Sequence, residues 1–569
     1  MTTGKLTVLE MPKVHATTKE RRKRTTAHPL WGDTWFIAII IVSIIASISA
    51  WWYFFSQGDV LLYNDAGSHL ILARRVIDSP TPGLAQLGGV WLPLPHLIMI
   101  PLIWSDYLWR TGLAGSFTSM PLYTITAIYL YQSAKRLTHN GMASFIGTLI
   151  FVLNPNILYL QSTPLSELTL FATMTITCYY FLVWTQTDDL ADLVKSAAAA
   201  FFMCIARYDG WAIFMACITF IVVIGLLRKH SAQKIFAHTI IFGWLGGLSI
   251  MLWFMWNKII FGSFLYFQNG PYSAQTQQAV AIKDNTDRTY HSVWYAFHDY
   301  TAITLESIGP IVFAIAILGL LLYLIKGRFR PEVWGAGLFL VPFAFYVLSL
   351  YTGQALIYAP HAAPNIVNDV WFNDRYGSGM AITASIYAAS FINVFKIYFK
   401  PIFIALIVVQ SILTFHGGVL TVQDGQFGVS CYSPSIIPFF LAAHYDTGYI
   451  LNDNYTTGIN FSDATPYVSL SDVVYQGSGK LWYESLADPA KYVDWIIVSP
   501  SDLVSRYIDI NSASFNSEYQ LMITDPQSGV MLYRLRNLPA LPNRNIQITN
   551  IQAFSKCGTV PLLKQTGNK

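Results

Sequence analysis

The chain has 569 residues, of which 54% are hydrophobic and only 12% are charged. Soluble domains carry about 25% charged residues, so this composition excludes a wholly soluble protein and indicates a chain that lies mostly in a membrane. The formal net charge of +4 is too small to indicate a nucleic-acid partner. The five cysteines show no Cys/His spacing typical of a zinc site.

The N-terminal residues 1–33 are polar and basic, with a run of four cations at 21–24 just before the first apolar segment. That segment, 34–56, is long enough to span a bilayer. The pattern predicts a cytoplasmic tail followed by a signal anchor that is not removed.

Further apolar segments recur up to residue 418, and basic clusters lie in several of the short loops between them. The apolar segments lie near 34–56, 93–109, 114–134, 142–160, 165–184, 193–206, 210–227, 236–260, 303–325, 334–352, 377–395 and 400–418. Short loops rich in Lys and Arg stay on the cytoplasmic side of the membrane. All the basic clusters lie on that side only if one of the early apolar segments does not cross the membrane. The proline-rich segment 93–109 is the weakest candidate, so we interpret it as re-entrant or interfacial.

The predicted fold class is therefore an α-helical polytopic membrane protein with about eleven crossings, twelve or thirteen being the alternative counts. The N-terminus is expected inside, and the long loops 57–92, 257–302 and 353–376 are expected outside. The short stretch 161–165 is likewise expected to be an outer loop.

Residues 419–569 alternate strand-like runs with turn signals, which predicts a soluble extracytoplasmic α/β domain. Strands are expected over 492–498 and 530–535, and a helix over 501–509. Cys431 and Cys557 both fall in this domain, and the sequence does not decide whether they form a disulfide.

The first outer loop carries Asp65 and His69, four residues apart. On a helix these side chains share a face. A carboxylate at the mouth of a membrane core is a candidate general base. The alternative is an aspartate that caps the helix beside a solvated histidine.

The other outer loops also place acidic residues, two of them beside an arginine, close to the membrane surface. Glu167 lies at the outer end of a crossing, where a lone charge is costly unless it faces protein or a wet cavity. Arg207 and Asp209 share the next turn, and Asp374 precedes Arg375 in the last loop.

The order and sidedness of these motifs resemble the GT-C superfamily of membrane glycosyltransferases, in its protein mannosyltransferase and aminoarabinose transferase branch. Asp65 matches the catalytic acidic residue of the first outer loop, and Glu167 matches the second acidic residue. The stretch 92–96, Leu-Pro-Leu-Pro-His, looks like a variant of the His-Pro-Pro-Leu element. Arg375 and Tyr376 match the Arg-Tyr pair associated with the lipid phosphate.

The resemblance implies a glycosyltransferase, hexosyl- or mannosyltransferase-like, that moves a sugar from a polyprenyl-phosphate-linked donor to a hydroxyl of a protein, lipid or glycan acceptor. Asp65 would act as general base at the outer membrane face, and Arg375 would hold the phosphate. Arg207 is the second candidate for the phosphate, or else a partner of Asp209 or Glu167. Membrane lipid is a further expected partner.

No cofactor is required on this interpretation, and a divalent metal is left open. The expected site comprises the catalytic Asp65 and Glu167 and the substrate-binding residues His69, His96, Arg207, Asp209, His361, Arg375 and Tyr376, with no metal ligand. A transporter or lipid-sugar flippase is the main alternative, although such a protein would place its ionisable residues near the bilayer midplane. A binding protein anchored by the helices is the third hypothesis.

Overall fold

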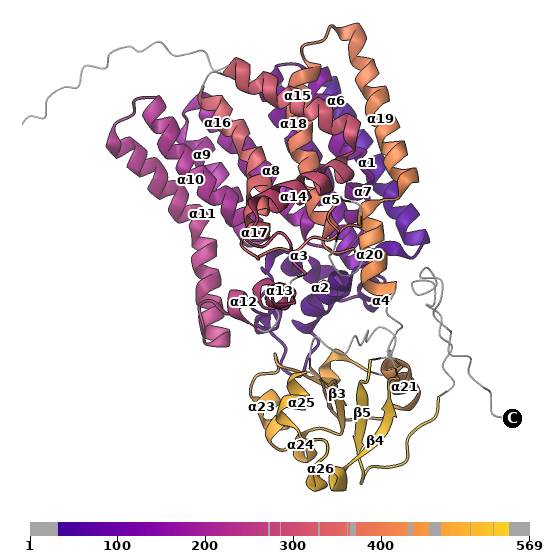
Figure 1. Cartoon of the computed structure of the whole chain (residues 1–569). Coiled ribbons are helices and arrows are strands. Elements are labelled where there is room, and N and C mark those ends of the chain that lie inside the picture. Colours follow the sequence, from indigo (N-terminus) through magenta and orange to yellow (C-terminus); the bar gives the residue numbers. More distant parts are fainter. Residues whose placement is uncertain are drawn as a thin grey trace, which may run out of the picture.

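The structure is a computed structural model in which a bundle of helices carries a small β-sheet domain at one end (Figure 1). It describes residues 32–270, 273–284, 286–327, 330–360, 362–364, 371–430, 436–453, 468–500, 502–526 and 528–544. The expected N-terminal tail and the two cysteines of the C-terminal region, Cys431 and Cys557, lie outside these residues.

The bundle is built from residues 34–430. Its helices are α1 (Thr34–Ser56), α2 (Asn64–Arg75), α3 (Leu94–Ile103), α4 (Asp106–Arg110), α5 (Leu113–Thr138), α6 (Gly141–Val152), α7 (Pro155–Leu160), α8 (Glu167–Thr187), α9 (Leu190–Cys204), α10 (Asp209–Leu227), α11 (Ala232–Phe261), α12 (Tyr266–Asn269), α13 (Ala274–Lys283), α14 (Val293–Ile308), α15 (Pro310–Gly327), α16 (Pro331–Gly337), α17 (Val341–Tyr351), α18 (Met380–Ile392), α19 (Lys400–Gly417) and α20 (Leu420–Ser430). Short 3₁₀ helices include η2 (Asp59–Leu61), η3 (Leu84–Leu87), η4 (Leu338–Leu340), η5 (Asp374–Gly377) and η6 (Ile397–Phe399).

Six stretches of helix within the described residues are long and apolar enough to cross a membrane. They are Thr34–Ser56, Glu167–Thr187, Asp209–Leu227, Ala232–Phe261, Pro331–Tyr351 and Ile397–Gln426. Counting the bent pair α14–α15 as one span gives seven. The chain is thus a multi-pass membrane protein, and the count of eleven crossings stays a prediction.

Two expected segments differ in shape from a simple crossing. The stretch 93–109 is divided between α3 and α4, and the 10 residues of α3 extend about 15 Å, half of a hydrocarbon core. The expected crossing 303–325 contains a bend of 114° between α14 and α15. Gly309 adopts a positive φ of 81° there, and Pro310 begins the new helix, so the backbone turns instead of continuing.

The long helices expose large apolar side chains on their outer faces, as lipid contact requires. On α11, Phe236, Ile240 and Trp244 are more than half exposed, and on α19 the same holds for Ile402 and Leu413. Such surfaces are stable only in an apolar medium.

The C-terminal domain is a five-stranded mixed sheet with strand order β2-β1-β3-β5-β4. Its elements are α21 (Ile437–His444), β1 (Ile450–Leu451), η7 (Leu470–Asp472), β2 (Val473–Val474), α23 (Lys480–Ala487), α24 (Pro489–Tyr492), β3 (Trp495–Val498), α25 (Leu503–Tyr507), α26 (Ala513–Glu518), β4 (Tyr519–Thr524) and β5 (Met531–Leu535). β1 pairs in parallel with β2 and β3, whereas β5 is antiparallel to β3 and β4. The expected strands 492–498 and 530–535 correspond to β3 and β5, and the expected helix corresponds to α25.

Candidate functional site

The stretch 161–165, expected to be a short outer loop, lies inside the protein. Gln161, Ser162 and Thr163 are fully buried. Ser116 Oγ on α5 donates a hydrogen bond of 2.7 Å to the carbonyl of Ser162. A Cβ at Gly115 would lie 2.0 Å from the Pro164 ring, so only glycine permits this contact. This close packing of residues 162–164 against α5 fixes the position at which α8 begins.

Glu167 occupies the first turn of α8, where the positive end of the helix dipole favours a carboxylate. The side chain is only 4% exposed, and two guanidinium groups share its Oε1. Arg207 Nη1 lies 3.0 Å away and Arg375 Nε lies 3.1 Å away. Glu167 Oε2 is buried and has no hydrogen-bond partner among the described residues, so it has free lone pairs.

Arg375 extends this network to the first loop. Its Nη2 lies 2.5 Å from Asp65 Oδ2, and the Asp65 side chain is 34% exposed. Asp65 sits in the first turn of α2, but the cap residue is Tyr63 and makes no side-chain capping bond. Asp65 is therefore held by Arg375. It does not cap helix α2, which was the alternative interpretation of this residue. The ion pairs thus bring Asp65, Glu167, Arg207 and Arg375 together, although Asp65 is not among the residues that line the cavity described below.

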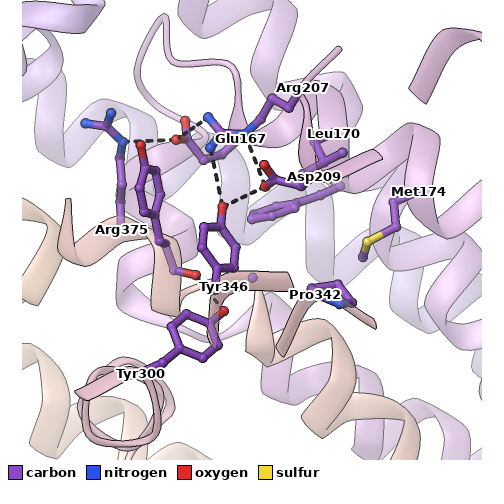
Figure 2. A pocket seen from close by; sticks show the side chains of 12 residues that line it. Glu167, Leu170, Met174, Arg207, Asp209, Tyr300, Pro342, Tyr346 and Arg375 are labelled. Carbon is purple, nitrogen blue, oxygen red and sulfur yellow. Dashed lines mark hydrogen bonds and ion pairs between the residues drawn. The ribbon is translucent and has the colours of Figure 1, made fainter. Parts of the chain in front are cut away.

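Arg207 contacts both carboxylates considered for it. Besides Glu167, its Nε lies 3.5 Å from Asp209 Oδ2. Asp209 also accepts a hydrogen bond of 2.6 Å from the Tyr346 hydroxyl on α17. In Figure 2, Tyr346 lies directly below Asp209 and Arg207.

A stack of tyrosines supports the arginines. Tyr300 stacks on Tyr346, and Tyr346 stacks on Tyr376, with ring centroids 5.1 Å apart in both pairs. The guanidinium carbons of Arg207 and Arg375 lie 5.4 and 5.5 Å from the Tyr376 ring, within cation–π range. The structure thus places Tyr376 beside both arginines, and its expected role in substrate binding stays a prediction; Tyr300 and Tyr346 were not predicted.

Both arginines remain charged, although Arg375 is buried and Arg207 is half-buried. Burial alone would lower the pKa of Arg375, but Asp65 and Glu167 raise that pKa well above its usual value. Burial opposes the charge of Arg207 in the same way, and Asp209 and Glu167 raise its pKa. The site therefore presents two permanent cations to a ligand.

A cavity lies against this network (Figure 2). Its lining combines charged and apolar side chains: Glu167, Leu170, Phe171, Met174, Arg207, Asp209, Tyr300, Pro342, Tyr346, Arg375, Tyr376 and Gly379. Figure 2 shows Met174 and Pro342 on one side and the ionic groups on the other. The cavity thus has a charged wall and an apolar wall.

Two predicted substrate-binding histidines pair with each other and do not line this cavity. His69 Nδ1 and His96 Nε2 lie 2.8 Å apart, and His69 stacks on Trp91 with ring centroids 4.3 Å apart. Both imidazoles are buried, so His69 is not the solvated histidine of the alternative interpretation. Burial, and then Arg375 and Arg207, lower the pKa of His69 to about 3. His361 lies outside the described residues.

An acidic residue of α20, which sequence reasoning did not identify, anchors the loop of Arg375. Asp424 Oδ2 accepts hydrogen bonds of 2.9 Å from the Tyr63 hydroxyl and from the Asp374 amide. α20 packs on α7 and η5, so this part of 419–569 lies with the bundle. Asp374 is fully buried, and burial, Asp424 and Glu306 raise its pKa well above its usual value.

The described residues contain no group of three or more His, Cys, Asp or Glu side chains that could hold a metal ion. The expectation that no cofactor is required stays a prediction. The groups that do converge can bind an anion through two arginines and accept a proton at a partly exposed carboxylate.

No protein-family model matches the chain, and no curated protein matches its sequence. ArnT from Cupriavidus metallidurans bound to undecaprenyl phosphate superimposes with a TM-score of 0.53 and 10% identity, covering 90% of this chain and 99% of ArnT. ArnT from the same organism in the apo state superimposes with a TM-score of 0.52 and 11% sequence identity. The match covers 87% of this chain and 98% of ArnT.

The archaeal oligosaccharyltransferase AglB from Archaeoglobus fulgidus, in complex with an inhibitory peptide and a dolichol-phosphate, gives a TM-score of 0.44 at 9% identity over 90% of this chain and 75% of AglB. The likeness to ArnT extends over both the bundle and the sheet domain, because almost the whole of each chain is covered. At such low identity it establishes the architecture. The chain therefore shares the fold of ArnT, in agreement with the fold that the resemblance in the sequence predicted.

Proposed function

We propose that this protein is a glycosyltransferase that takes a sugar from a polyprenyl-phosphate-linked donor and transfers it to a hydroxyl group of a protein, lipid or glycan acceptor at the outer membrane face. Asp65 acts as the general base, and the arginines hold the phosphate. The positive charges in the short loops support this orientation, since such loops stay cytoplasmic.

The observation that carries the proposal is the bridge made by Arg375. Its guanidinium contacts the partly exposed Asp65 on one side and the buried Glu167 on the other. A planar guanidinium with several donors can exchange one carboxylate oxygen for a phosphate oxygen without losing its remaining partners. Donor binding would then place the phosphate beside Asp65.

The reaction balances without a further reagent. The acceptor oxygen attacks the anomeric carbon of the sugar as its proton passes to Asp65. The bond from that carbon to the phosphate oxygen breaks, and its electron pair leaves on the polyprenyl phosphate. Arg375 and Arg207 stabilise the charge that develops on this leaving group. The apolar wall of the cavity suits the first isoprene units of the lipid.

Two further observations support the donor class. The fold is that of ArnT, which was crystallised with undecaprenyl phosphate. Asp65 also lies on α2, which Figure 1 shows between the bundle and the sheet domain, and it contacts Arg375 of η5. A transporter would instead place such groups near the bilayer midplane.

The test uses the full-length protein in lipid nanodiscs, undecaprenyl phosphate as a binding probe, and a panel of polyprenyl-phosphate sugars followed by mass spectrometry. We expect binding of undecaprenyl phosphate, weakened at least tenfold in Arg375→Ala and retained in the control Lys480→Ala, whose side chain is 86% exposed in the sheet domain. We also expect acceptor-dependent release of polyprenyl phosphate. Absence of both binding and release would overturn the proposal.

A further inference from the structure

Helix α2 connects the candidate site to the sheet domain. It is 12 residues long, or about 18 Å at a rise of roughly 1.5 Å per residue. Asp65 lies in its first turn, and Arg74 and Arg75 lie in its last turn. Asp78 follows directly, and its amide donates a hydrogen bond of 2.9 Å to the carbonyl of Arg74. Asp78 is thus tied to the end of the helix.

Asp78 is clamped by the sheet domain. Its Oδ1 accepts hydrogen bonds from Ser469 Oγ at 2.7 Å, from Ser471 Oγ at 2.5 Å and from the Ser471 amide at 3.1 Å. Its Oδ2 accepts from Arg74 Nε at 3.2 Å. Burial opposes ionisation, but the hydrogen bonds from Ser471, Ser469 and Arg74 lower the pKa of Asp78. An ionised carboxylate therefore joins two segments nearly 400 residues apart.

Neighbouring contacts strengthen the same junction. The Arg75 guanidinium carbon lies 3.6 Å from the centre of the Tyr475 ring, and both side chains are buried. Gln86 Nε2 donates a hydrogen bond of 3.1 Å to the carbonyl of Gly477. In each of these two pairs, one residue belongs to the first loop and the other to the sheet domain.

The apolar side chains of this region form one core. Leu70 and Ala73 of α2, with Met99 and Ile103 of α3, belong to the same buried cluster as sheet-domain residues Ile437, Leu441, Leu470, Val473 and Trp495. Figure 1 shows α2, α3 and α4 between the bundle and the sheet domain. Only the start of α2, at Tyr63 and Ala66, packs into the main core of the bundle.

We propose that the sheet domain positions Asp65 through α2, and that Asp78 is the positioning residue of this connection. The C-terminal half of α2 shares a buried core with the sheet domain and contacts it through Arg75 and the following Asp78, whereas the loop of Arg375 is held by Asp424 of α20. The relative position of the two domains therefore sets the Asp65–Arg375 contact. A misplacement of about 1 Å can cost about 10²-fold in rate.

The first measurement needs no substrate and so does not depend on the proposed function. Hydrogen–deuterium exchange of residues 64–75 is followed in the full-length protein. We expect faster exchange in Asp78→Ala, and also in the double variant Ser469→Ala plus Ser471→Ala, which removes the partners from the other side. The control Asp446→Asn breaks an ion pair inside the sheet domain, Arg534 Nη2 to Asp446 Oδ2 at 2.5 Å, and should leave this segment unchanged.

The second measurement is turnover, which rests on the proposed function. Asp78→Ala should lower kcat by about 10²-fold, with little change in undecaprenyl phosphate affinity, because the arginines are untouched. Combining Asp78→Ala with the two serine changes should cost no more than either alone, since both remove one clamp. Unchanged exchange at 64–75 in both variants would overturn the inference. An active Asp65→Asn enzyme would instead overturn the assignment of the base.

Discussion

Arg375 Nη2 lies 2.5 Å from Asp65 Oδ2, and this contact joins two loops that are 310 residues apart in the sequence. Through its Nε, Arg375 also lies 3.1 Å from Glu167 Oε1, so this guanidinium spans the partly exposed carboxylate and the buried one. In the proposed reaction, a phosphate bound by Arg375 would therefore lie next to Asp65, where the acceptor hydroxyl must lose its proton.

Asp65→Asn should abolish glycosyl transfer and leave undecaprenyl phosphate binding nearly intact. Asn keeps the size and an acceptor oxygen but cannot take up the acceptor proton at neutral pH. A general base contributes about 10²- to 10⁴-fold in rate, so turnover should fall by that factor. The control is Glu484→Gln in α23, a carboxylate with the same 34% side-chain exposure that also pairs with a cation. Near-normal turnover in Asp65→Asn would leave Glu167 as the next candidate.

Glu167→Gln should destabilise the protein more than Asp65→Asn does. The buried Glu167 Oε1 is shared by the guanidinium groups of Arg375, which is buried, and Arg207, which is half-buried, and the neutral amide leaves them without this countercharge. Removing one partner of a buried ion pair costs about 3–5 kcal/mol. Asp65 is partly exposed, so water compensates for much of its loss. Thermal unfolding in nanodiscs measures both variants, and equal midpoints would contradict a structural role for Glu167.

The charged part of the site could be predicted from the sequence because charges at the ends of apolar segments need partners. That cost singled out Glu167, whereas Asp65, Arg207 and Arg375 followed from the order and sidedness of the outer-loop motifs and from the resemblance that they carry. It also placed the strands around Trp495 and Leu532, where apolar runs end in turn signals.

The rest depends on tertiary contacts that leave no local pattern. Tyr300 and Tyr346 lie in aromatic-rich apolar stretches, where a core tyrosine and a site tyrosine look the same. Asp424 reaches the site only because α20 returns to η5. The bend at Gly309 did have a signal, since Gly-Pro breaks helices, but the apolar run on both sides concealed it.

The sheet domain should be extracytoplasmic and the N-terminus cytoplasmic. Single cysteines at Thr17 and Lys480, in a background with Cys431 and Cys557 replaced by serine, report the orientation through an impermeant thiol reagent. The other three cysteines are buried and should not react. We expect labelling of Lys480→Cys on intact cells and of Thr17→Cys only after permeabilisation. The reverse pattern would invert the proposed topology.

His69 should make stability depend on pH. Unfolded histidine has a pKa of about 6.5, whereas burial, Arg375 and Arg207 lower the pKa of folded His69 to about 3. Between these values only the unfolded chain binds the proton. The stabilisation from neutral His69 is therefore complete above about pH 6.5 and falls by about 1.4 kcal/mol per pH unit below it, until about pH 3.

His69→Gln removes this titration and keeps a polar side chain beside His96, which lies 2.8 Å from His69 in the structure. Thermal unfolding of both proteins at about pH 7.5 and about pH 5 isolates the effect of His69, because the carboxylates titrate alike in both. The wild type should lose about 2 kcal/mol more than the variant over this interval. An equal loss of stability in the two proteins would show that His69 gains a proton in the folded protein. The interpretation of His69 and His96 as a neutral pair would then be wrong.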